Sequence, residues 1–393
     1  MKNYYWFFVL STFAFSSCSL GDDLFGSGDA ETLTCSDFDD DVRLQHQDGR
    51  SVDYIIDCLV EVDATDIVIE ENTVVEFTEG SGLIIKGDAV LTIVSQVDDE
   101  WITLRGQESR AGFWKGIHID SDSRISRILR THISDAGDNT DSRFKGAVHV
   151  KTFATITNST ISNVEGCGLY VDNQAQMQSG MVDLEISNCS SYPVSVPIPE
   201  WDRFYVVTPP NAALYGNLEV NNCGPNKVEV RGSNTTALRE VNGDIIGLDI
   251  PYQVGGVVNV PISNRLKFLP GAMIEMQEDT RIFVEGSFSV DGVSGNPAVI
   301  YGSVDEPGYW GGIHIDRPTA QTANVIEYLH ILNGGGGTFE NANITLKSGK
   351  YIVENCRISK SATCGLRYFE NAVMLTETGN TYADNAGGGL CKD

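Results

Sequence analysis

Two short segments that pair a histidine with an aspartate are the first candidates for chemistry in this sequence. His118 and Asp120 belong to the octet FWKGIHID. A near-copy, YWGGIHID, follows 196 positions later and carries His314 and Asp316. Alternate residues of a β-strand face the same side, so each histidine would share an outward face with its aspartate while the isoleucines face the core. An imidazole beside a carboxylate can bind a metal ion or transfer protons near neutral pH.

The repeat spacing brings a second histidine to the first of these pairs. Short apolar runs follow His118 at steps of 31 and then 21 residues, which places His149 and then Tyr170 beside it on neighbouring strands. In the second copy the steps are 31 and 22, and Thr345 and Arg367 take the matching positions. Two imidazoles about 4.8 Å apart with a carboxylate next to them could act as acid and base. Because the second copy lacks this trio, a catalytic site and a set of surface residues carried along by duplication both stay open.

The aromatic residues ahead of the repeated strands are candidates for ligand binding. Trp114 and Trp310 each precede the Gly-Ile strand. An indole ring there would either stack on a sugar or pack at a corner of the fold. Together with His314 and Asp316, the two tryptophans form the predicted ligand-binding set.

Calcium is a candidate cofactor. Asp135, Asp138 and Asp141 supply enough carboxylate oxygens for this ion, but their segment lacks the spacing and the terminal Glu of an EF-hand. A solvated loop is the alternative. The sequence has no Cys-x-x-Cys, Walker loop, Gly-x-Ser-x-Gly or His-Glu-x-x-His segment, so we assign no metal ligand and no catalytic residue.

Self-similarity at a fixed spacing predicts the fold. Short β-rich runs such as Val74–Phe77 and Leu83–Ile85 are divided by Gly, Asp, Asn and Ser, and no apolar pattern of helical length occurs. A repeat near 22 residues with turn residues at its corners is what a parallel β-helix needs. We therefore predict an all-β chain: one right-handed parallel β-helix over residues 53–393, built from two duplicated halves, about 53–243 and 244–393, behind an N-terminal cap.

The first 17 residues have the features of an export signal. Lys2 supplies a positive start, and an apolar run from Tyr4 to Phe15, too short to span a membrane, ends in small residues. Cys18 follows directly, and the segment FSSC resembles a bacterial lipobox, in which the cysteine becomes the lipidated first residue of the mature protein. A soluble secreted protein is the alternative. Residues 18–52 are predicted to form a tether followed by the cap.

Eight cysteines remain after Cys18. In an exported chain an even number permits disulfides without fixing their pairing. Cys35 and Cys58 are predicted to pair because both precede the first repeat, where the end of a solenoid needs closing.

The charge balance argues against one class of partner. Asp and Glu number 54 against 27 Lys and Arg, a formal net charge of −27. Such a chain would repel phosphate backbones, so nucleic acid is not a predicted partner.

Several segments of the second half resemble a known group of proteins. The segments PYQVGG at 251–256, LKFLPG at 266–271, WGGI at 310–313 and CGL at 364–366 resemble the right-handed parallel β-helix repeats of Bacteroidetes surface lipoproteins. The resemblance covers about residue 53 to the C-terminus. It implies a protein held by its lipid in the outer membrane, exposed on the cell surface or facing the periplasm. It is specific for architecture rather than activity, because this fold serves lyases, glycoside hydrolases and adhesins alike.

Two functions are consistent with these patterns. We expect a non-catalytic envelope protein: a scaffold, an adhesin or a glycan-contacting surface protein that meets polysaccharides or other surface proteins. The alternative is a polysaccharide-degrading enzyme, a lyase or a glycoside hydrolase, that uses the outward face around His118, Asp120 and His149. An enzyme should gather ionisable groups in a groove of one copy, whereas a scaffold should not.

Overall fold

The computed structural model describes residues 28–122, 125–178, 181–208, 212–215, 217–232, 240–316, 324–337 and 342–393. The predicted export signal, the lipidation candidate Cys18 and the first residues of the tether lie outside these stretches.

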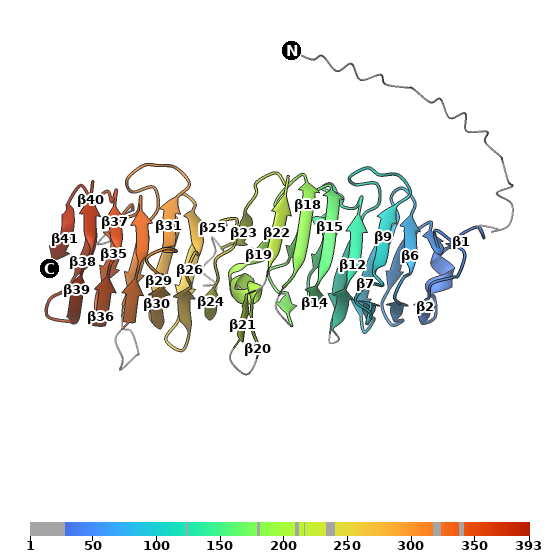
Figure 1. The fold of residues 1–393 in the computed structure, drawn as a ribbon, viewed down its shortest axis with the longest axis horizontal. Helices are drawn as coiled ribbons and strands as arrows, with labels where there is room; N and C mark the ends of the chain where they lie inside the picture. Colours follow the sequence, from blue (N-terminus) through green and yellow to red (C-terminus); the bar gives the residue numbers. More distant parts are fainter. Residues whose placement is uncertain are drawn as a thin grey trace, which may run out of the picture.

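Short strands stack into an elongated parallel β-solenoid (Figure 1). Strands account for 52% of the residues and helix for 3%, which confirms the predicted all-β class. The coils follow one another along one axis, with β1 (Glu31–Leu33) at one end and β41 (Gly388–Lys392) at the other. The described strands also include one antiparallel hairpin, β20 (Tyr205–Thr208) with β21 (Ala212–Tyr215).

One sheet of 13 strands, here called the long sheet, runs through both halves. Its strands are, in order, β4 (Leu59–Val62), β7 (Gly82–Gly87), β10 (Ile117–Ser121), β13 (Gly146–Val150), β16 (Cys167–Val171), β19 (Val194–Pro197), β23 (Val228–Arg231), β25 (Tyr252–Gly255), β28 (Met273–Met276), β31 (Ala298–Gly302), β34 (Leu329–Leu332), β37 (Arg357–Ser359) and β40 (Thr381–Ala383).

The other faces of the first half are two shorter sheets. The eight-stranded sheet contains β1, β3 (Tyr54–Ile56), β6 (Val74–Phe77), β9 (Ile102–Gly106), β12 (Thr131–Ser134), β15 (Ser159–Val164), β18 (Leu184–Cys189) and β22 (Leu218–Asn221). The six-stranded sheet contains β2 (Val42–Leu44), β5 (Ile67–Ile69), β8 (Leu91–Val94), β11 (Ser126–Leu129), β14 (Phe153–Thr157) and β17 (Gln176–Met177).

Two further six-stranded sheets complete the second half. One contains β24 (Gly243–Ile245), β27 (Arg265–Phe268), β30 (Ser287–Asp291), β33 (Asn324–Glu327), β36 (Gly349–Glu354) and β39 (Val373–Thr378). The other contains β26 (Val257–Val260), β29 (Arg281–Val284), β32 (Gly312–Ile315), β35 (Ala342–Leu346), β38 (Cys364–Tyr368) and β41. Two 3₁₀ segments, η1 (Cys35–Phe38) and η2 (Ile198–Phe204), account for the described helix.

The core consists of apolar rows that run along the solenoid axis. In the long sheet one inward row joins successive coils and is buried throughout: Leu83, Ile117, Val148, Leu169, Val194, Val228, Tyr252, Ile274, Ile300, Ile331 and Ile358. Burying each aliphatic side chain of this row contributes roughly 1.5–3 kcal/mol. These rows explain why the β-rich runs repeat.

Asparagine and aspartate form one corner of the first half. Asp135 and Asn222 directly follow strands of the eight-stranded sheet, and Asn163 and Asn188 are the next-to-last residues of two others. Each has a positive φ, between 52° and 67°. These residue types tolerate the left-handed conformation that the turn requires. The Asn222 amide donates to the Asn188 carbonyl oxygen at 2.8 Å, so the corner residues also bind one another from coil to coil.

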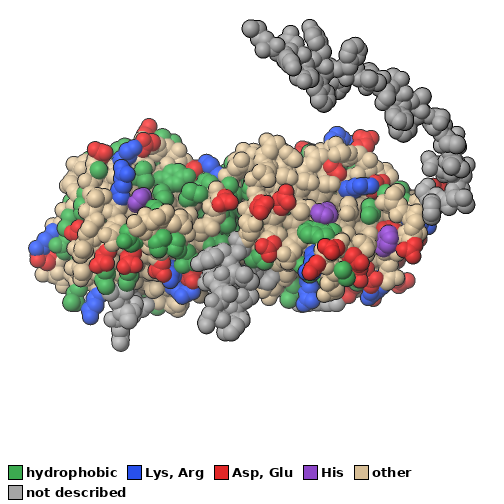
Figure 2. Space-filling view, viewed as in Figure 1, with side chains coloured by type: hydrophobic (Ala, Val, Ile, Leu, Met, Phe, Trp, Pro, Cys, Tyr) green, Lys and Arg blue, Asp and Glu red, His purple; other side chains and the backbone are tan. Residues whose placement is uncertain are grey.

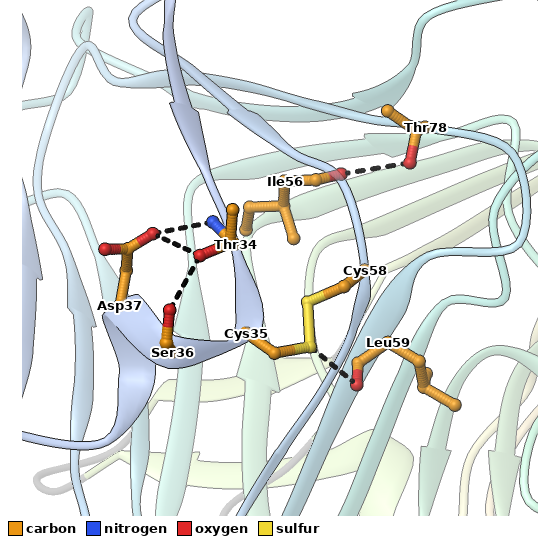
Figure 3. Close-up of a disulfide and its surroundings, with 8 residues drawn as sticks. All are labelled: Thr34, Cys35, Ser36, Asp37, Ile56, Cys58, Leu59 and Thr78. Atoms are coloured by element: carbon orange, nitrogen blue, oxygen red, sulfur yellow. Dashed lines mark hydrogen bonds between the residues drawn. A yellow bond between two sulfur atoms is a disulfide. The ribbon is translucent and has the colours of Figure 1, made fainter.

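A cap closes the N-terminal end (Figure 3). The η1 turn is joined to the start of β4 by the disulfide Cys35–Cys58, the pair named from the sequence. Within the turn, the Asp37 carboxylate accepts hydrogen bonds from the backbone and the hydroxyl of Thr34 at 2.7 and 2.9 Å. Two more disulfides, Cys189–Cys223 and Cys364–Cys391, join neighbouring coils.

The two copies of the duplicated octet lie on different faces of the solenoid. His118 is in β10, a member of the long sheet, whereas His314 is in β32, which belongs to the sheet that ends at β41. The preceding strands show the same shift, since β9 lies in the eight-stranded sheet and its counterpart β31 in the long sheet. The second copy is therefore turned by one face about the solenoid axis, and corresponding side chains point in different directions.

The halves meet in the middle of the long sheet. That sheet continues without a break through β23, β25 and β28. The two other sheets of the first half end at β17 and β22, and the two other sheets of the second half begin at β24 and β26. The predicted boundary at 243/244 falls inside β24. The hairpin β20–β21 projects from the body near this junction (Figure 1).

Candidate functional site

The outward face of the long sheet carries a continuous row of polar and aromatic side chains, here called the outer row. It consists of His118, His149, Tyr170, Ser195, Glu229, Gln253, Glu275 and Tyr301. The register predicted from the repeat spacing, His118 beside His149 beside Tyr170, is confirmed. The ring centroids of each neighbouring pair are 4.9 Å apart.

The loop between β12 and β13 covers both histidines. The Nδ1 atoms of His118 and His149 lie 2.7 and 2.8 Å from the same acceptor, the carbonyl oxygen of Arg143. Phe144, next to that carbonyl, is fully buried. His118 is 5% exposed and His149 2%, so these two outward-facing side chains are covered and not open to solvent. The extra residues of the 31-residue step fold back over the strands.

Burial also sets the protonation state of His118. Burial, together with the neighbouring His149, lowers the pKa of that imidazole to about 4 against the opposing effects of the Arg143 carbonyl and Asp120. The ring is therefore neutral near pH 7 and donates its Nδ1 hydrogen to the loop. An acid or base for catalysis near neutral pH needs a pKa close to that pH and access to substrate.

The carboxylates beside the histidines have close partners of their own. Asp120 lies 2.6 Å from the Lys151 ammonium group. Asp172 lies 3.5 Å from Nε2 of His149, and its interaction with that ring lowers the pKa of Asp172 to about 2. The candidates His118, Asp120 and His149 are thus brought together by the structure, but as parts of a covered cluster.

Cations cover the next member of the outer row. The Arg231 guanidinium lies 4.0 Å from the ring centroid of Tyr170 and donates to the Tyr170 hydroxyl and to the Val171 carbonyl. The Lys145 ammonium lies 4.6 Å from the same centroid. Tyr170 is therefore a packing partner for these side chains.

The second copy does not repeat this cluster. His314 pairs with Thr345, as the spacing predicts, and its other strand neighbour is Phe283. Its Nε2 lies 3.1 Å from the Gly311 carbonyl oxygen, and the side chain is nearly buried. Asp316 is half-buried on the same face. Since this face is turned away from that of His118, the two copies do not combine into one site.

The two tryptophans are corner residues. Trp114 and Trp310 are 0% exposed. Their indole nitrogens donate to the carbonyls of Ser134 and Leu332 at 2.7 and 2.9 Å, and Trp114 stacks on Phe77 with centroids 3.9 Å apart. Of the two interpretations of these residues, packing at a corner holds, and the sugar-stacking interpretation is wrong because neither ring face is accessible.

The acidic loop has its own partners. Asp138 accepts a hydrogen bond from Lys115 at 2.6 Å, and Asp141 accepts one from Arg143 at 2.7 Å. Asp135 binds Asn163 at 2.7 Å. Among the described residues, no group of three or more His, Cys, Asp or Glu side chains converges as metal ligands would.

Beyond the covered histidines, the outer row reaches an open groove where the two halves meet. The groove has a volume of about 380 Å³ and is lined by Tyr192, Glu229, Val230, Arg231, Gly232, Gln253, Gly255, Gly256, Gln277 and Glu278. Sequence reasoning missed it. The sequence feature that could have indicated the groove is the pair Gly255-Gly256 at the end of a strand-like run. Glycine weakens a strand and can mark a place where a ligand or another backbone comes close.

Hydrogen bonds fix the polar floor of this groove. Gln253 accepts from the Tyr192 hydroxyl at 2.5 Å and donates to Glu275 at 2.8 Å. Glu275 also binds the Lys227 ammonium at 2.7 Å and the Ser303 hydroxyl at 2.8 Å. These partners lower the pKa of Glu275 against the opposing effect of burial. A glycosidase acid needs the opposite, a raised pKa, so Glu275 is not suited to that role.

Comparisons of the chain with protein-family models, with curated proteins and with solved structures found no match. The fold and the site therefore define an architectural class, a parallel β-solenoid of about 13 turns, here with an open groove near the middle of its long sheet. Among the residues that the structure describes, no helix has the length and apolar character needed to cross a membrane.

Proposed function

We propose that this protein is an exported, lipid-anchored component of the cell envelope, of the Bacteroidetes surface-lipoprotein kind, whose solenoid acts as a non-catalytic scaffold. It contacts a glycan or another surface partner rather than converting it. The observation that carries the proposal is the covered histidine row. His118 and His149, the residues best suited by type and spacing to acid–base work, are held by one loop carbonyl away from solvent.

The disulfides support export. Three pairs of cysteines are bonded among the described residues. Disulfides persist in oxidising compartments and are rare in the cytosol. The FSSC segment ending at Cys18 supports attachment through a lipid, with the solenoid held off the membrane by the residues before the cap.

Product release tests the non-catalytic role. The full chain, purified in detergent, is incubated with acidic and neutral polysaccharides, with and without calcium, and new reducing or unsaturated ends are measured. We expect none above background, and we expect the His118→Ala variant to give the same result. Cleavage by the wild-type chain that is lost in this variant would establish the enzyme instead.

A substitution at the predicted lipidation site tests the anchor. The Cys18→Ser variant should leave the envelope fraction and appear in the soluble fraction, because a lipid-modified cysteine is the proposed attachment. Retention of this variant in the envelope would contradict a lipid anchor.

A further inference from the structure

We infer that the groove at the junction of the two halves is a binding site for a neutral saccharide. This inference rests on the proposed non-catalytic role and names the ligand class and the residues that meet it. The groove lacks one side chain on its floor, and its walls carry hydrogen-bonding groups with a net negative charge.

Gly255 creates the slot. It lies on the outward face of β25, beside Arg231 of β23, and Gln277 follows directly after the pair of Val254 with Met276. Outward side chains therefore stand on either side of a strand position that has none. Two interstrand spacings separate Arg231 from Gln277, roughly 9.6 Å between backbones.

The absence of a side chain at Gly255 has no steric cause. A Cβ atom built there would meet only Cγ of Gln277, at 3.9 Å, and its φ is not in the left-handed region. Gly232 differs, because a Cβ there would lie 2.0 Å from the Gly255 carbonyl oxygen. Gly256 also differs, with a φ of 78°. Glycine weakens a strand, and one reason for its presence is a ligand that approaches the backbone closely.

The walls suit hydroxyl groups. Glu229 and Glu278 are acceptors only, and Glu229 already accepts from the Ser195 hydroxyl. The amide of Gln277 donates one hydrogen to Ser303 at 3.1 Å and keeps a second donor and its acceptor oxygen. Sugar hydroxyls can satisfy both kinds of group. The side chain of Gln253, on the floor of the groove, is fixed by Tyr192 and Glu275, so it is positioned before a ligand arrives. The pocket volume of about 380 Å³ is at the lower end of the usual range for small-ligand sites.

The charges argue against an acidic sugar. Two carboxylates line the groove together with a single guanidinium, and that guanidinium already donates to Tyr170 and Val171. A uronate would meet excess negative charge in a chain whose formal net charge is −27. The ligand class that remains compatible with these donors and acceptors is the uncharged saccharide.

The test measures binding of neutral hexose and pentose oligosaccharides to the full chain in detergent by calorimetry, with oligogalacturonate and chitosan oligosaccharides beside them. We expect a neutral oligosaccharide to bind and the acidic one to bind at least about 10-fold more weakly. The Gly255→Val variant fills the slot and should weaken binding at least about 10-fold while leaving Tm unchanged or higher, since valine favours a strand. Gln277→Ala should weaken binding about 5- to 10-fold through one lost hydrogen bond.

The matched control is Gly295→Val, at a glycine where an added Cβ meets nothing within 4 Å and which does not line the groove. This variant should bind like the wild type. Undiminished binding by Gly255→Val, binding of chitosan or oligogalacturonate alone, or no binding of any neutral oligosaccharide would overturn the inference. The last result would leave the non-catalytic role standing, because product release tests that role separately.

Discussion

The two central histidines act through one shared acceptor. His118 and His149 both point their Nδ1 atoms at the Arg143 carbonyl, and both have their rings between strands and loop. The imidazoles donate to this loop carbonyl and fill the space between the strands and the loop. Their residue types suggest catalysis, but their contacts show that they attach a loop to a sheet.

The lowered pKa of His118 predicts a pH dependence of stability. The folded-state pKa is about 4 and the ordinary value is 6.5, so between these pH values the unfolded chain binds more protons than the folded one. The contribution of this histidine to stability is therefore present above pH 6.5 and is lost as the pH falls towards 4, by at most about 3 kcal/mol. Urea unfolding at a series of pH values measures it.

The matched variant for this prediction is His118→Asn, which keeps a side-chain donor but does not titrate. The free energy of unfolding of this variant is subtracted from that of the wild type at each pH. The difference removes the pH dependence that other groups contribute, including Glu200 and Asp202, whose pKa values burial raises. A wild-type minus variant difference that stays flat from pH 6.5 to 4 would show that His118 is not held neutral.

Sequence predicts which residues are neighbours better than whether they are accessible. The steps of 31 and 21 residues fix His118 beside His149 beside Tyr170, because backbone pairing leaves little freedom once the coil length is known. The covering of that row depends on which way the loop folds, and no spacing reveals it. The groove is harder to predict, because it forms where Gly255 has no side chain and the residues on the neighbouring strands do.

The two ends of the solenoid differ in how far the sequence predicts their structure. The position of Cys35 and Cys58 before the first repeat was enough to name their pairing, since an end must be closed. The outer strands β39, β40 and β41 form the opposite end, where Met374 and Leu390 are exposed. A cap of the kind formed by η1 is not seen there among the described residues.

The cap disulfide should stabilise the N-terminal coils only. Replacing Cys35 and Cys58 together with serine removes a crosslink between residues 23 apart in sequence, which costs about 3 kcal/mol. Because each coil of a solenoid contacts only its neighbours, we expect faster amide hydrogen exchange from β1 to β7 and unchanged exchange beyond β28. The same change at Cys364 and Cys391 should act at the other end. An equal acceleration along the whole chain would contradict this account.

On the scale of the molecule, duplication produced a longer solenoid without repeating a site. The second copy is turned by one face, so the counterpart of His118 lies in a different sheet, and the open groove lies where the copies join. Figure 2 shows one face of the body, on which acidic and basic side chains are interspersed and hydrophobic ones gather over the C-terminal half. Interspersed charge of this kind suits solubility more than the steering of one charged ligand.

The protonation of His118 in the intact protein tests the central claim most directly. The chain has six histidines, and ¹³C labelling of their rings allows each to be followed by NMR as the pH changes, with His118→Asn for assignment. We predict that the His118 ring stays neutral down to a pH near 4, as a covered structural donor should. Titration of this ring near its ordinary pKa of 6.5 would show an accessible imidazole and return the row to the list of catalytic candidates.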